Sequence, residues 1–132
     1  MSVGAESPKN PSDTLAVVKN AMQLHPLSTP MGDKEMIGQI DDVFSTHWEK
    51  DSPISAGFFT VKAGEPFTYT YGYNELKLVV EGTLILEDKT KGVKIEAHPG
   101  DTLSIPKGTP VTFSSPNFAK AFYVGQRAYR EW

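Results

Sequence analysis

The chain has 132 residues, a net charge of −3 and no cysteine. This length favours one domain whose core is large enough to hold a single small-molecule cavity. The acidic balance argues against nucleic acid or an anionic membrane as a partner, since both need a basic face. Without cysteine, disulfides, thiolate chemistry and cysteine zinc sites are excluded.

No stretch approaches the roughly 18 apolar residues of a membrane-spanning helix. Residues 1–8 lack the basic start and the apolar run of a signal peptide. We therefore expect a cytoplasmic protein.

The N-terminal part of the chain differs in texture from the rest. Residues 1–11 are rich in Ser, Pro, Gly and Asn, which is typical of a loose arm. Residues 14–24 place apolar side chains at approximately helical spacing and predict a short helix. Two prolines make His25–Pro30 a helix breaker. We expect an arm with a short helix over residues 1–33, followed by one domain over residues 34–132.

From Glu35 onward, short β-prone runs alternate with Gly, Pro, Asp and Asn. Many short strands at near-regular spacing predict an all-β fold, an antiparallel sandwich or barrel. The predicted strands cover residues 35–45, 54–61, 66–71, 75–80, 83–87, 93–97, 102–105, 110–114 and 118–124.

Two segments carry most of the information. The first runs from Glu75 to Gly82, and the second from Gly100 to Gly108. Pro106 and Gly108 suit a tight turn, because proline has a fixed φ and glycine can adopt a positive one.

Together these segments resemble the two motifs of the cupin superfamily. A closer resemblance, over most of residues 54–132, is to the single-domain cupins of the EutQ (ethanolamine-utilisation) type. The resemblance implies a small double-sheet β-barrel of the jelly-roll kind. The matching segments are Ser55–Phe59, Tyr73–Gly82, Pro99–Gly108 and Ala121–Val124.

The resemblance also implies where a metal would bind, because metal-dependent cupins place two histidines before the glutamate and a third after the Pro-X-Gly turn. Here the first two positions fall on Tyr69 and Tyr71, or on Thr70 and Gly72 in another register. Val111 stands at the third position. A lone carboxylate is a poor site for a transition metal, so we expect no metal and no cofactor. A metal-dependent oxygenase with atypical ligands is the alternative.

The three histidines of the chain are His25, His47 and His98. They are far apart and irregularly spaced, so we expect surface or turn positions for them. His47 and its neighbour Trp48 are the partial exception, because their segment could fold over a barrel mouth.

If Glu75 points into the barrel, as the resemblance implies, Lys77 shares its face because side chains alternate along a strand. Such a partly desolvated pair offers a general acid and a general base. One alternative is an internal salt bridge that merely satisfies both charges. The other is a reversed strand in which Leu76 and Leu78 face the core and the charges face water.

An alternating row of tyrosines, Tyr69, Tyr71 and Tyr73, precedes Glu75. Phenol rings supply a flat apolar wall and a hydroxyl that can donate to a developing oxyanion. We predict Glu75, Lys77 and Tyr73 as catalytic residues, although core packing is the alternative for each aromatic. The predicted substrate-binding residues are Tyr69, Tyr71, Trp48, Phe113 and Tyr123.

The sequence thus favours a metal-independent enzyme that moves protons on a small organic substrate, as a lyase, dehydratase, decarboxylase or isomerase. A non-catalytic cupin that binds a small molecule is the alternative. The resemblance also implies an acetate-kinase-like activity, but the chain has no phosphate loop of the P-loop type, no dinucleotide fingerprint and no nucleophile elbow. We expect a homodimer, because open sheet edges invite pairing.

Overall fold

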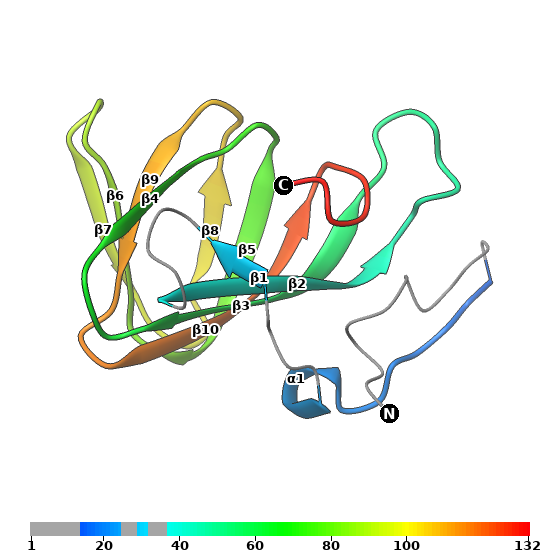
Figure 1. Ribbon diagram of the computed structural model, residues 1–132, viewed down its shortest axis with the longest axis horizontal. Coiled ribbons are helices and arrows are strands. Elements are labelled where there is room, and N and C mark those ends of the chain that lie inside the picture. Colours follow the sequence, from blue (N-terminus) through cyan, green and yellow to red (C-terminus); the bar gives the residue numbers. More distant parts are fainter. Residues whose placement is uncertain (1–13, 25–28, 32–36) are drawn as a thin grey trace.

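The computed structural model describes residues 14–24, 29–31 and 37–132 of the chain. Two antiparallel sheets pack face to face, which confirms the predicted all-β, double-sheet jelly roll (Figure 1). One sheet has the strand order β1-β2-β3-β10-β5-β8 and the other the order β4-β9-β6-β7. The elements are α1 (Ala21–Leu24), β1 (Thr29–Met31), β2 (Gly38–Ser45), β3 (Ser55–Lys62), β4 (Phe67–Thr70), β5 (Glu75–Gly82), β6 (Leu84–Asp88), β7 (Val93–Ala97), β8 (Thr102–Ile105), β9 (Pro110–Ser114) and β10 (Phe118–Gly125).

Turn glycines set the strand boundaries in both motif segments. Gly82, Gly100 and Gly108 have φ angles of 72°, 96° and 93°, in the left-handed region that favours glycine. Gly82 also has no room for a side chain, because a Cβ there would lie 1.7 Å from the carbonyl oxygen of Phe118. The motif spacing seen in the sequence is therefore the spacing of the turns around β5 and β8.

The core lies between the two sheets and is rich in aromatic rings. Phe113 packs between Phe59, at a centroid distance of 5.0 Å, and Phe67, at 5.5 Å. All three side chains are fully buried. Because β-branched and aromatic side chains pack well on a pleated surface, the alternating strands bury one face each in this layer.

The predicted N-terminal helix over residues 14–24 is mostly wrong. Among the described residues the helix is confined to α1, and Leu15 is 99% exposed. Asn20 has a φ of 57°, which interrupts a right-handed helix, and a segment this short is unstable without tertiary packing. The ammonium of Lys120 donates to the carbonyl of Met22 at 3.0 Å and so holds α1 beside the six-stranded sheet.

The helix ends at Leu24, directly before the predicted breaker His25–Pro30, whose last two residues begin β1. Pro30 is tolerated there since β1 is an edge strand, where a missing backbone donor leaves no ladder bond unmade. Residues 25–28, like residues 1–13 of the predicted arm, lie outside the described residues.

The outer face of the six-stranded sheet exposes large apolar side chains. Leu76 is 60% exposed, and Ile54, Leu78 and Phe122 are also exposed. In the described part of the chain, no helix is long and apolar enough to cross a membrane.

Candidate active site

Strand β5 presents two of its three charged side chains to the interior, and the third, Glu81, is exposed. Glu75 and Lys77 are 1% and 2% exposed, whereas Leu76 between them is largely exposed. The strand therefore has the orientation that the resemblance implied, and the reversed strand with charges in water is wrong. Cross-strand pairing with β8 and β10 fixes this register, because a slip of one residue would turn every side chain to the other face.

The two charges form a fully buried ion pair. The ammonium nitrogen of Lys77 lies 2.7 Å from Glu75 Oε2, and neither side chain has exposed area. The two groups are close but not aligned as a hydrogen bond, and neither carboxylate oxygen has a hydrogen-bond partner among the described residues. Buried polar groups are nearly always satisfied, so an unsatisfied pair of this kind needs an explanation.

Aromatic rings surround the ammonium. Lys77 Nζ lies 4.0 Å from the ring centroid of Phe59 and 5.1 Å from that of Tyr123. Burial lowers the pKa of Lys77 below its ordinary value, although the charge of Glu75 opposes this shift. The rings therefore stabilise the cation only in part, and the lysine gives up a proton more readily than a surface lysine does.

The three tyrosines of the row reach the same region. Tyr71 is fully buried, its hydroxyl has no hydrogen-bond partner among the described residues, and its ring packs edge-on against Tyr69 and Tyr73. The hydroxyls of Tyr69 and Tyr73 lie 3.3 Å apart. Burial first, and then the charge of Glu75, raises the pKa of Tyr71 well above its ordinary value and also raises that of Tyr73. These phenols therefore stay protonated and can act as donors.

A second charged cluster, which the sequence analysis missed, closes this end of the barrel. Arg127 binds Asp42 with two hydrogen bonds, from Nη1 to Oδ2 at 2.7 Å and from Nη2 to Oδ1 at 2.8 Å. The hydroxyl of Tyr123 donates to the same carboxylate at 2.6 Å. Burial with this carboxylate raises the pKa of Tyr123, so the predicted substrate-binding tyrosine is occupied by Asp42.

The C-terminal segment folds back over the barrel through a matching pair (Figure 1). The guanidinium of Arg130 binds both carboxylate oxygens of Asp41, at 2.8 and 2.9 Å. The guanidinium carbon of Arg127 lies 5.1 Å from the ring of Tyr73 and 4.8 Å from the ring of Trp132. Two adjacent aspartates inside a predicted strand, with two arginines near the C-terminus, were the signal that could have revealed these pairs.

The remaining predicted residues lie farther from the buried pair. Phe113 is a core residue between two phenylalanines, and its ring centroid is 5.8 Å from Lys77 Nζ. Trp48 lies in the loop between β2 and β3, with its ring edge-on to His47 at 5.4 Å. His98 lies on the surface, where its Nε2 is 3.0 Å from a Glu96 oxygen. His25 is outside the described residues.

The donors around Glu75 do not fit a divalent metal. An ammonium already lies 2.7 Å from Oε2, so a second cation beside the carboxylate would meet a like charge. The positions where the superfamily pattern expects imidazoles hold Tyr69, Tyr71 and Val111, and valine has no donor atom. Across the described residues, no group of three or more His, Cys, Asp or Glu side chains could hold a metal ion.

Gly125 lies opposite Glu75 across the sheet. A Cβ at this position would lie 3.4 Å from Glu75 Oε1, an ordinary contact, and 3.2 Å from the ring of Tyr73, which is tight. A side chain here would therefore press on Tyr73, next to the fully buried carboxylate of Glu75.

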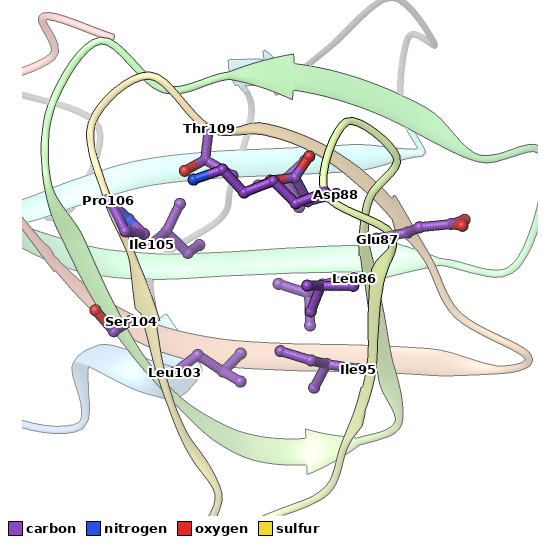
Figure 2. A pocket seen from close by; sticks show the side chains of 12 residues that line it. Leu86, Glu87, Asp88, Ile95, Leu103, Ser104, Ile105, Pro106 and Thr109 are labelled. Atoms are coloured by element: carbon purple, nitrogen blue, oxygen red, sulfur yellow. The ribbon is translucent and has the colours of Figure 1, made fainter.

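An apolar pocket opens beside the buried pair, between β8 and the hairpin of β6 and β7 (Figure 2). Its volume is about 180 Å³. Ile105 and Leu103 in its wall are the direct cross-strand partners of Glu75 and Lys77, so the wall is one residue away from the charges. Figure 2 shows Leu86, Ile95, Leu103 and Ile105 directed toward one another across the pocket.

A family model and two related proteins identify the same family for this chain. The family described as "Ethanolamine utilisation protein EutQ" matches residues 11–132. The chain is 30% identical over 124 residues to "Acetate kinase EutQ" of Clostridioides difficile, covering 85% of this chain and 76% of the relative. It is 32% identical over 76 residues to "Acetate kinase EutQ" of Salmonella typhimurium. This match covers 58% of this chain and 32% of that longer protein.

Solved structures agree with the fold. The structure of the Clostridium difficile EutQ protein superposes with a TM-score of 0.59 at 32% identity, covering 69% of this chain and 63% of that one. The polyketide cyclase RemF from Streptomyces resistomycificus superposes with a TM-score of 0.60 at 17% identity, covering 77% of this chain and 71% of RemF. The second likeness shows a shared fold alone.

Proposed function

Because the chain belongs to the EutQ family of cupins, whose glutamate it retains beside a buried lysine, we propose that it is a small-molecule enzyme that catalyses proton transfer without a metal. The observation that carries the proposal is the buried, unsatisfied polar group of Glu75, Lys77 and the Tyr71 hydroxyl. Leaving such groups unpaired costs about 1–3 kcal/mol each, and sites where proteins accept this cost are frequently catalytic.

Each member of the group has a distinct role. Oε1 of Glu75 is the general base, because Oε2 lies 2.7 Å from the ammonium of Lys77. Lys77 supplies the positive charge that a divalent cation provides in a metal enzyme. Tyr71 and Tyr73, which stay protonated, donate to an oxygen on which charge develops.

The reaction that suits these roles begins at a carbon beside a carbonyl group. Glu75 takes the proton of that carbon, and the electron pair of the broken C–H bond forms an enolate whose oxygen faces Lys77. In an isomerase acting on a β,γ-unsaturated carbonyl compound, the enolate is conjugated with the double bond and the proton returns to the γ-carbon. In a lyase or dehydratase the electron pair expels a leaving group on the next carbon, and that group takes the proton.

The variant Glu75→Gln tests this function directly, because the amide keeps the shape of the side chain and removes its basicity. Turnover of carbonyl substrates, followed as exchange of the α-proton with D₂O by proton NMR, should fall by at least about 100-fold, the usual share of a general base. Glu96→Gln, on the exposed strand β7, is the matched control and should keep full activity. Unchanged exchange in Glu75→Gln would rule the base assignment out.

Phosphoryl transfer between ATP and acetate is the second candidate, favoured by the name of the relatives, "Acetate kinase EutQ". The matched part of the Salmonella typhimurium protein is about a third of its length, so the named activity there belongs to a longer chain. Release of ADP in the presence of acetate and Mg²⁺, measured with a coupled assay, decides between the two. ADP release that survives Glu75→Gln would favour the kinase and place its site elsewhere.

A homodimer stays a prediction. The exposed apolar side chains of Leu76, Leu78 and Phe122 on the outer face of the six-stranded sheet are the surface that supports it. A self-complementary patch of this kind suits a two-fold contact.

A further inference from the structure

The pocket beside β8 has the size and lining of a site for one small organic molecule. Its volume of about 180 Å³ slightly exceeds the roughly 150 Å³ of an aliphatic-lined cavity that holds benzene in another protein. Apolar residues of both sheets line it, namely Leu86, Val93, Ile95, Leu103, Ile105 and Val111. A ligand that fills it therefore has an apolar body the size of one ring or a short branched chain.

The pocket has few polar groups, and they differ in the hydrogen bonds and ion pairs that they already form. Lys91 lines it, and among the residues that the structure describes this lysine forms no ion pair. Asp88 also lines the pocket, but its carboxylate accepts hydrogen bonds from the amide and the hydroxyl of Thr90, at 3.0 and 2.6 Å. Figure 2 shows the Glu87 side chain directed away from the other lining side chains. The lowered pKa of Asp88, caused first by the Thr90 hydroxyl and in smaller part by the charge of Lys91, keeps this carboxylate ionised near the lysine. Lys91 is the cationic side chain of the lining that a carboxylate ligand would contact.

Residues in the wall of the pocket lie directly opposite residues of the candidate active site on neighbouring strands. Ile105 pairs with Glu75 across β5 and β8, and Val111 pairs with Tyr69 across β4 and β9. Directly opposite residues in an antiparallel pair have their Cβ atoms about 5 Å apart. A molecule in the pocket is therefore separated from the proposed base by a single layer of aliphatic side chains.

We propose that this pocket binds a compact monocarboxylate, with its apolar ring or branched chain among the aliphatic side chains and its carboxylate on Lys91. This binding site goes beyond the proposed function and does not depend on it, because aliphatic side chains separate the pocket from Glu75. A site with an apolar lining and one or two placed polar groups is the usual form of a small-molecule site.

Binding of two probes of matched shape tests the proposal. Benzoate and benzyl alcohol are titrated into the full chain, with the methyl resonances of Leu86, Leu103, Ile105 and Val111 followed by NMR. Both probes should shift these methyl groups, and benzoate should bind about two- to fivefold more tightly, the worth of one partly exposed ion pair. Absence of methyl shifts with both probes overturns the site, and equal affinities overturn the carboxylate.

Variants of two neighbouring lysines separate a local contact from general charge. Lys91→Met should reduce benzoate binding to the level of benzyl alcohol, whereas Lys89→Met, in the same hairpin but not in the pocket lining, should leave the preference intact. Equal losses in both variants would mean that net charge alone attracts benzoate and would refute the assigned contact.

Filling the pocket gives a readout independent of charge. Ile95→Trp, on the half-exposed strand β7, should weaken benzyl alcohol binding at least about tenfold, while Lys94→Trp, one residue away and not in the lining, should not. Tight binding in Ile95→Trp overturns the site. If the Glu75→Gln variant still binds the probes but has lost turnover, both proposals are supported. If the variant retains turnover, the proposed function is refuted, whereas the proposed binding site is not affected.

Discussion

Removing the positive half of the buried pair should destabilise the protein in a strongly pH-dependent way. In Lys77→Met the Glu75 carboxyl group remains fully buried with no counter-charge. Breaking a buried pair in this way costs about 3–5 kcal/mol. The carboxyl group can avoid part of that cost by taking up a proton on folding.

The cost of this proton uptake sets the size of the stability loss in Lys77→Met. A glutamate in the unfolded chain has an ordinary pKa of about 4.3, and each pH unit above it costs about 1.36 kcal/mol for a group that must fold protonated. The loss of stability is therefore about 3.7 kcal/mol at pH 7 and about 1 kcal/mol at pH 5. The sign follows because the folded variant binds more protons than the unfolded chain above this pKa, so stability falls as pH rises.

The intact pair, in contrast, contributes little net stability. At 2.7 Å and an effective dielectric constant of about 20, the attraction is about 6 kcal/mol, and desolvating two ions costs several kcal/mol each. The double variant Glu75→Leu/Lys77→Met should therefore be as stable as the wild type or more stable, by up to about 4 kcal/mol, and inactive.

Urea unfolding followed by far-UV circular dichroism at pH 5 and pH 7 measures all three free energies. A Lys77→Met variant as stable as the wild type at pH 7, or a loss that does not change with pH, would refute the burial argument. A double variant less stable than the wild type would show that the pair is kept for stability rather than for chemistry.

Three further predictions concern residues around the same end of the barrel. Tyr71→Phe removes a buried hydroxyl without a partner among the described residues, so the free energy of unfolding should rise by about 1 kcal/mol while α-proton exchange slows; lower stability with full activity would contradict its assigned role. Gly57→Ala places a Cβ 2.0 Å from the carbonyl oxygen of Asp41 and should lower the free energy of urea unfolding by about 3 kcal/mol. Gly72→Ala is the control and should be nearly neutral, because a Cβ there meets open space. Equal stabilities of the two variants would show that β2 and β3 can separate at Gly57. Leu76→Glu should convert a dimer to a monomer in sedimentation equilibrium without loss of folding, and a wild-type monomer would remove the dimer prediction.

Local patterns in the sequence were sufficient for most of the fold. The predicted strands at 93–97, 102–105 and 110–114 have the bounds of β7, β8 and β9, because a period of two and a turn glycine or proline at each end are properties of neighbouring residues. The helix at 14–24 was wrong for the complementary reason. Helical spacing without a surface to pack on does not hold a helix of this length.

The contacts that could not be predicted join distant parts of the chain. Asp42 and Arg127 are 85 residues apart, so two adjacent aspartates inside a predicted strand indicate buried charge without identifying which arginine pairs with which. The bulge between Asp42 and Phe44 adds to the difficulty, because an extra residue disturbs the alternation from which burial is inferred.

The direction of Lys77 shows where pattern alone fails. Charged and apolar residues alternate along β5, so the pattern fits two orientations equally, and the ordinary preference of leucine for the core favours the wrong one. The correct orientation needs two compensations outside the strand: aromatic rings such as Phe59 beside the ammonium, and an outer face that accepts exposed leucines. Burying the ion pair and exposing the leucines is less favourable for folding than burying the leucines in an apolar core would be. If the buried charges are kept for chemistry, as the proposed function requires, the double variant should be at least as stable as the wild type, and the comparison of these two proteins measures that difference.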